Sequence, residues 1–239
     1  MRLNRAALWP VGASLLATLA LAAMAVPSAL GGFSATIASS GGSAGSGTLL
    51  LQEGLGATIC ISTGNGTSSS SSIVANDNSN CPLDLFASTN LAPYDSTATP
   101  GSPGSAASAT VHLTNAGSLA GSSLTLTPGH CTVGDNLSPG GISNTYFGTD
   151  TAGFCGKIDA TIENDTGGKA QCVFPSASTS ACPAPSASGN LANLATETLP
   201  ALASHASATY TVTVALDPSA TNADQGLLAT VPLTWTLNQ

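Results

Sequence analysis

The sequence has few charged and few aromatic residues. Of its 239 residues only four are Lys or Arg and twelve are Asp or Glu, while aromatic residues make up 4%. Charged residues form about a quarter of an average globular protein, but here they form 7%. Nucleic acids and anionic lipids are bound by clustered Lys and Arg, so this composition argues against both as partners. With few large side chains, a core must be assembled from Val, Leu, Ile and Ala on many short strands.

The motifs of catalytic and metal sites are also missing. The chain has no Cys-x-x-Cys, no His-Glu-x-x-His and no Gly-x-Ser-x-Gly elbow between a strand and a helix. Three histidines are scattered without the spacing of metal ligands: His112, His130 and His205. Four aspartates lack the spacing of a calcium loop, and we interpret them as solvated loop acids: Asp135, Asp150, Asp159 and Asp165. We therefore expect a protein that is not an enzyme and has no metal and no cofactor.

Residues 1–31 have the pattern of an export signal. Arg2 and Arg5 precede an apolar run at residues 13–26, and small residues follow it. The small-x-small rule places the predicted cleavage between Gly31 and Gly32. The uncharged run that contains this segment is also long enough to span a bilayer, so an uncleaved anchor is the alternative. Cleavage predicts a secreted protein, extracellular or on the cell surface, with no membrane attachment. Two lysines would then face twelve acids, a formal charge of −10.

The part after the leader contains six cysteines: Cys60, Cys81, Cys131, Cys155, Cys172 and Cys182. An even number of cysteines in an exported chain indicates disulfides, and six cysteines allow 15 connectivities. Our working hypothesis is sequential pairing, Cys60–Cys81, Cys131–Cys155 and Cys172–Cys182. Each of these bonds would close a loop rich in Ser, Gly and Asn. Such a loop cannot be held by burial of apolar side chains, so a covalent bond takes that role.

Short strand patterns recur between Gly- and Pro-rich turns. They lie at residues 47–51, 57–62, 109–115, 118–128, 157–165, 170–174, 207–217 and 227–239, with a weaker one at 82–86. Only residues 188–199 favour a short helix. The pattern predicts an all-β fold, a jelly-roll-like antiparallel β-sandwich with disulfide-stapled loops. We expect a single domain at residues 47–239, with a Cys-rich insertion at about residues 129–185.

The two C-terminal strands have the clearest period of two. Residues 227–239 place one apolar set on a single face: Leu227, Ala229, Val231, Leu233, Trp235 and Leu237. Pro232 falls on the opposite face and has no N–H group to donate. The last strand is therefore predicted to lie near an edge or to carry a bulge. Trp235 is the only Trp after the leader, and we expect it to pack in the core rather than to stack on a ligand.

A short apolar segment directly follows the expected cleavage site. Phe33, Ala35 and Ile37 alternate with Ser34 and Thr36, as in a strand that presents one apolar face. Residues 38–46 are mostly Gly, Ser and Ala, the composition of a flexible tether. The segment either pairs with another surface or remains unpaired, and the residues alone do not decide between these.

Three stretches together resemble the TasA/camelysin family of exported proteins. The first is Gly31-Gly32-Phe33 followed by "SGTLLL" at residues 46–51. The second is "LTNAGSLAGSSLTL" at residues 113–126, and the third is the final "TWTLNQ". The matches cover about a third of the chain after the leader, and the order of the short motifs carries the resemblance.

The resemblance implies a jelly-roll subunit of a matrix or surface fibre. It implies that a SipW-type signal peptidase removes the leader. It also implies head-to-tail assembly of identical copies, in which Phe33, Ala35 and Ile37 of one subunit form a donor strand that completes a sheet of the next. This chain departs from the best-known members in two features. Those members are rich in Lys and have no disulfides, whereas this chain is poor in Lys and has six Cys. The insertion at residues 129–185 has no counterpart that we can match.

Two other functions remain open at this point. A monomeric surface adhesin would use the Cys-stapled loops as its binding face and would not need residues 32–46. A secreted metalloprotease of the camelysin type is the third reading, although no motif in this chain supports it.

Overall fold

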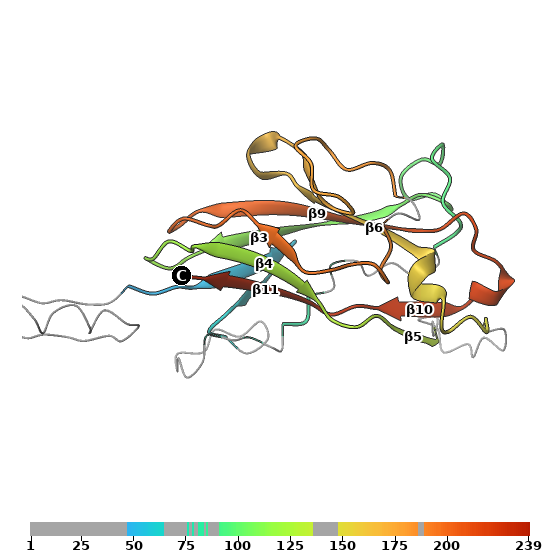
Figure 1. The fold of residues 1–239 in the computed structure, drawn as a ribbon, viewed down its shortest axis with the longest axis horizontal. Coiled ribbons are helices and arrows are strands. Elements are labelled where there is room, and N and C mark those ends of the chain that lie inside the picture. Colours follow the sequence, from blue (N-terminus) through green and yellow to red (C-terminus); the bar gives the residue numbers. More distant parts are fainter. Residues whose placement is uncertain are drawn as a thin grey trace, which may run out of the picture. The chain divides into compact units, whose positions relative to one another are not determined.

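The computed structural model describes residues 47–64, 76, 78, 81–83, 85, 91–135, 148–185 and 189–239. The chain divides into two compact units, Met1–Gly47 and Thr48–Gln239, and the description below concerns the second. This unit is almost entirely β-structure, and its antiparallel sheets pack against each other as predicted (Figure 1). No helix in the described ranges is long and apolar enough to cross a membrane.

The larger sheet has six antiparallel strands in the order β2-β1-β3-β9-β6-β7. These strands are β2 (Thr58–Ile61), β1 (Leu51–Leu55), β3 (Ala107–Asn115), β9 (Ser207–Leu216), β6 (Ile158–Asn164) and β7 (Gln171–Phe174). Strands that are neighbours in this sheet are mostly distant in sequence. The central pair, β3 and β9, runs from Ala107↔Val214 to Thr114↔Ser207.

Two smaller sheets complete the described fold. One contains β11 (Leu233–Asn238), β4 (Ser123–Pro128) and β8 (Glu197–Leu199) in that order. The other pairs β10 (Leu227–Thr230) with β5 (Thr132–Asp135). Three short 3₁₀ segments lie between strands: η1 (Phe154–Lys157), η2 (Thr166–Gly168) and η3 (Asn222–Asp224). Figure 1 shows the layer of β3, β9 and β6 over the layer of β4 and β11.

The core lies between the large sheet and the β11-β4-β8 sheet. Alternation along β3 and β9 buries Val111, Leu113, Tyr210 and Val212, while their neighbours face outward. Leu124 and Leu126 of β4 are completely buried on the opposing layer. Most of the remaining core side chains are also aliphatic. The core is therefore filled mainly by interdigitating Leu, Val and Ile side chains from both layers, with few aromatic residues.

The observed strands agree with the sequence patterns except in a few places. The first pattern is displaced, because β1 begins at Leu51, and β5 was not predicted. The pattern at residues 227–239 is divided at Val231 and Pro232 into β10 and β11, but its predicted apolar face is the less exposed one throughout. β11 is an edge strand, as Pro232 indicated. The described residues of the weak pattern at 82–86 form no strand.

The helix predicted at residues 188–199 is wrong. The described residues 189–199 form a turn followed by β8. Tertiary pairing decides this, because the Ala160 N–H donates to the Gly189 carbonyl and the Leu191 N–H donates to the Ile158 carbonyl. The segment therefore extends alongside β6, and this pairing outweighs the weak local preference for a helix.

The three disulfides join the cysteines in sequential order: Cys60–Cys81, Cys131–Cys155 and Cys172–Cys182. No described cysteine is free. Residues 129–185 supply β5, β6 and β7, so the Cys-rich segment is built into the sheets. Three intramolecular disulfides indicate an extracellular or otherwise oxidising environment.

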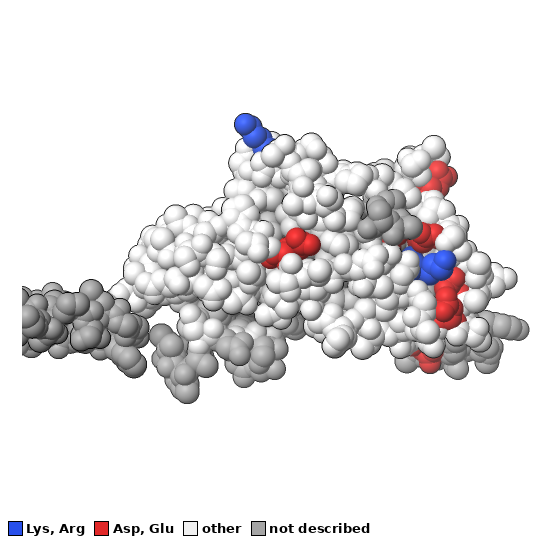
Figure 2. Space-filling model, viewed as in Figure 1, with Lys and Arg blue, Asp and Glu red and all other residues white. Residues whose placement is uncertain are grey.

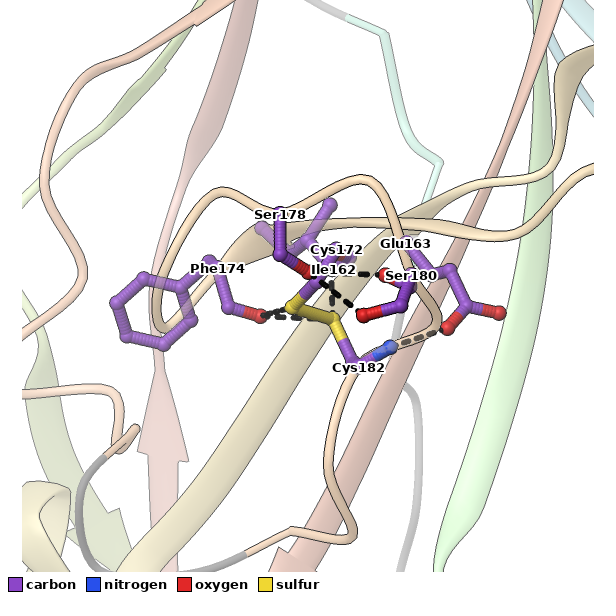
Figure 3. The surroundings of a disulfide bond; sticks show 7 residues. All are labelled: Ile162, Glu163, Cys172, Phe174, Ser178, Ser180 and Cys182. Atoms are coloured by element: carbon purple, nitrogen blue, oxygen red, sulfur yellow. Dashed lines mark hydrogen bonds between the residues drawn. A yellow bond between two sulfur atoms is a disulfide. The ribbon is translucent and has the colours of Figure 1, made fainter.

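The loop closed by Cys172 and Cys182 lies against β6 (Figure 3). The Cys172 N–H donates to the Ser180 carbonyl at 2.7 Å, and the Ser178 N–H donates to the Cys172 carbonyl at 2.9 Å. The Cys182 N–H donates to Glu163 Oε2 at 2.7 Å. A loop made largely of small polar residues is thus held by a covalent bond and hydrogen bonds rather than by apolar burial.

Substitution of Leu126 by Ala tests this description of the core. Leu126 is completely buried, so its truncation leaves a cavity and should lower the free energy of unfolding by about 2–5 kcal/mol. The matched control is Leu228→Ala, because Leu228 is 39% exposed and a surface substitution changes stability by about 0.5 kcal/mol at most. Chemical denaturation of both variants measures the difference. Equal effects would contradict the proposed packing.

Candidate assembly edge

β11 is the edge strand that is most open to a further strand. It pairs with β4 on one side, and no described strand pairs with its other side. The edge strands of the other two sheets are shorter: β2, β7, β5 and β10 have four residues each, and Cys60 of β2 and Cys172 of β7 also belong to disulfides. β8, the opposite edge of the smaller sheet, is only three residues long. Short or covalently restrained edges resist pairing with another chain, whereas an unprotected long edge favours it.

The backbone of β11 presents groups on its open side that pair with no described strand. The Gly129 N–H donates to the Pro232 carbonyl at 2.7 Å, which fixes the phase of the ladder between β4 and β11. In an antiparallel ladder alternate residues direct their backbone groups to the same side. Thr234 and Thr236 therefore bond to β4, and the backbone groups of Trp235 and Leu237 point toward the open side.

The inward side chains of β11 are incompletely covered. Leu233, Trp235 and Leu237 are half-buried, while Leu124 and Leu126, their neighbours on β4, are completely buried. On this face of the sheet, the side chains are therefore completely buried on β4 but only partly buried on β11. An additional strand beside β11 with apolar side chains on the same face would complete the coverage.

Trp235 connects this edge to the large sheet. Its indole Nε1–H donates to Glu53 Oε1 of β1 at 2.8 Å, and its ring centroid lies 5.4 Å from that of Tyr210 on β9. Trp235 packs against the core, as predicted from its position in the alternation. Leu51 and Leu55, which flank Glu53 on the inward face of β1, are half-buried. The edge is therefore lined by apolar side chains from both layers, with one carboxylate among them.

Burial changes the acid–base properties of two groups at this edge. Desolvation raises the pKa of Glu53 above its usual value of 4.5, and the hydrogen bond from Trp235 opposes part of that rise. Desolvation also raises the pKa of Tyr210 to about 12. Tyr210 is completely buried, and its hydroxyl has no hydrogen-bond partner within the described part of the chain. The polar atoms near Trp235 are thus held in an environment of low polarity.

The two motifs of residues 46–51 and 113–126 contact each other where the chain enters β1. The Ala116 N–H donates to the Leu50 carbonyl at 2.8 Å, and the Leu119 N–H donates to the Thr48 carbonyl at 3.0 Å. A side chain at Gly117 would collide with the backbone of residues 48–50, so only glycine allows this approach. This end of the described chain also carries the C-terminus (Figure 1).

Asn115 holds this junction together from inside. It is completely buried, and its Nδ2 donates to the Leu119 carbonyl at 2.8 Å and to the Leu202 carbonyl at 3.2 Å. Its Oδ1 accepts from the Gly117 N–H at 3.0 Å. A buried amide with both ends bonded fixes the turn between β3 and β4. This turn positions the start of β1.

Five of the predicted site residues lie outside the described ranges. This applies to the predicted donor strand, Phe33, Ala35 and Ile37, and to the predicted cleavage site, Gly31 and Gly32. The three histidines are exposed, and the ring of His112 on β3 lies 3.1 Å from the hydroxyl of Thr209. Among the described residues no three His, Cys, Asp or Glu side chains form a group that could hold a metal ion.

Sequence reasoning missed Glu53. The segment Leu51–Leu55 alternates, and this places Glu53 on the same face as two leucines. An acid within an apolar face is a signal of a buried carboxylate with a specific partner. That signal was present in the sequence, but its partner Trp235 is 182 residues away.

Comparisons with known proteins give no family for this chain. A scan against protein-family models found no match. A search of curated proteins found none either.

Replacing Glu53 by Gln tests the electrostatics of the edge. Gln keeps an acceptor for the Trp235 N–H but cannot ionise. Because the folded-state pKa of Glu53 is raised, wild-type stability should fall as pH rises from below 4.5 through that raised pKa. We expect the Gln variant to be the more stable protein at pH 7, with the difference decreasing as the solution is acidified. Denaturation monitored by Trp235 fluorescence over this pH range measures it, and a difference independent of pH would contradict the assignment.

Proposed function

We propose that this protein is a secreted structural subunit of an extracellular or cell-surface fibre. Residues 33–37 of one copy would add as a strand to the open side of β11 in the next. The observation that carries the proposal is the edge itself, a long strand with half-buried inward side chains and no described neighbour on its outer side.

The composition supports a structural role. Ser, Thr, Gly and Ala dominate the chain, and no group of catalytic residues occurs in the sequence patterns. The three disulfides suit an exported protein. Processing by a SipW-type signal peptidase, which the resemblance to TasA and camelysin implies, is part of the same proposal.

The donor segment and the acceptor edge have matching patterns. Apolar residues alternate with small polar ones in both strands: Phe33, Ala35 and Ile37 in the donor, and Leu233, Trp235 and Leu237 at the edge. Backbone hydrogen bonds to the open side of β11 would supply affinity, and the three apolar side chains would set the register. The Gly- and Ser-rich residues 38–46 give the donor enough reach to leave its own subunit.

Such contacts produce an open filament when the rotation between subunits does not close a ring. The donor segment and the acceptor edge are different surfaces of the same chain, so each subunit accepts one strand and donates another. A heterologous contact of this kind continues indefinitely unless its rotation closes a ring.

Removal of residues 32–40 should abolish the filaments. We expect the intact purified protein to form regular filaments when it is concentrated or acidified, and the shortened variant to remain dispersed because it has no donor strand. Negative-stain electron microscopy distinguishes the two. Filaments that are unchanged by the deletion would overturn the donor assignment.

A matched pair of variants tests the register of the donor. Changing Phe33, Ala35 and Ile37 to Ser removes the proposed inward face and should prevent assembly. Changing Ser34 and Thr36 to Ala alters the other face and should leave filaments intact. If the intact protein stays monomeric under every condition, the fibre function is wrong and a monomeric binding module is favoured.

A further inference from the structure

Asp159 of β6 is a buried carboxylate without a partner. Its side chain has no exposed surface, and neither carboxylate oxygen has a hydrogen-bond partner among the described residues. Buried acceptors are nearly always satisfied, and a buried ionised carboxylate without donors is costly. The interpretation of Asp159 as a solvated loop acid is therefore wrong, because it lies inside a strand that is covered on both faces.

Two other oxygen-bearing side chains lie near Asp159. Asp159 lies opposite Ala215 on β9, and on its other side it forms a bridge with Asn190. Asp217 directly follows β9, its N–H donates to the Lys157 carbonyl at 2.8 Å, and its charge acts on Asp159. Asp217 and Asn190 are each less than a tenth exposed. Three adjacent segments thus bring two carboxylates and one amide together.

Local contacts orient Asp217 and Asn190 but leave the negative charge incompletely balanced. Asp217 Oδ1 accepts from the Ser219 N–H at 2.6 Å, and Asn190 Oδ1 accepts from the Asn193 N–H at 3.1 Å. The nearby ammonium of Lys157 donates to Ser219 Oγ at 2.8 Å, and its positive charge acts on both carboxylates. One ammonium therefore stands near two carboxylates.

The pKa values of Asp159 and Asp217 reflect their surroundings in different directions. Burial and the negative charge of Asp217 raise the pKa of Asp159 to about 6, and Lys157 offsets only part of that rise. Hydrogen bonds from Ser219 lower the pKa of Asp217. At pH 7 both groups are mainly ionised. On the face shown in Figure 2, acidic side chains gather at the end of the sandwich away from the C-terminus.

We propose that Asp159, Asp217 and Asn190 bind a hard divalent cation, with calcium as the best match. All three side chains offer oxygen, the atom that calcium prefers, and none offers the sulfur or imidazole of a transition-metal site. A cation between the strands would supply the positive partner that both Asp159 oxygens lack. It would also bridge β6, β9 and the residues 189–191. Two carboxylates are a small ligand charge, so we expect a dissociation constant on the order of 10⁻⁴–10⁻³ M, as in extracellular calcium modules.

Calcium titration of the purified full-length protein tests the proposal. After treatment with a chelator, CaCl₂ is added at constant ionic strength, and thermal unfolding and heat of binding are measured. We expect a saturable rise in the unfolding temperature, because a ligand that binds only the folded state stabilises it. Magnesium should give a smaller rise, since it requires stricter octahedral geometry.

Two matched variants identify the site. Asp159→Asn keeps the shape of the side chain, removes a buried charge and should fold, but it should lose the response to calcium. Asp135→Asn removes an exposed charge on β5 and should respond as the wild type does. A wild-type protein without a saturable response up to the millimolar range would overturn the proposal, and so would equal responses of the two variants. Neither measurement depends on filament formation, so the result is independent of the proposed function.

Discussion

The two-sided pairing of β9 is the interaction on which the rest of the structure depends. β9 bonds to β3 on one side and to β6 on the other along most of its length. Its inward residues, such as Tyr210 and Val212, form the centre of the core. Its outward hydroxyls bond across to β3, for example Thr213 to Ser108 at 2.8 Å. Cross-strand pairs on both faces stabilise a sheet, so this strand fixes the register of the β1–β3 half relative to the β6–β7 half.

The edge strands of the sheets differ in how well they are protected against pairing with another chain. A disulfide restrains each edge of the large sheet, through Cys60 on β2 and Cys172 on β7. A chain with few charged residues cannot protect edges by the usual placement of lysines, so covalent bonds serve this purpose. β11 has neither a disulfide nor a charged residue. This lack of protection, together with a length of six residues, makes β11 the candidate surface for assembly.

The few acids of the chain acquire distinct roles through their surroundings. Glu53 is half-buried near the open edge and accepts a hydrogen bond from Trp235, which partly offsets the cost of desolvating its carboxylate. Asp159 is buried near the other end of the large sheet and has no such donor. Equivalent side chains thus differ because one faces an indole N–H and the other faces a second carboxylate. The charged residues are scattered along the sequence, but the fold places Glu53 and Asp159 in surroundings that raise their pKa values.

The sequence by itself determined the all-β class, most strand positions and the apolar face of residues 227–239. These features are local, because period-two alternation is a property of consecutive residues. The sequential order of the disulfides was one hypothesis among 15 connectivities, and the tertiary structure decided it. Only the tertiary structure decided the strand order, the extended path of residues 189–199, the open edge at β11 and the partners of Glu53 and Asp159. Each of these depends on segments that are far apart in the chain, such as Glu53 and Trp235 or Asp159 and Asp217. Alternation states which face of a strand is apolar, but it does not state which strand lies beside it.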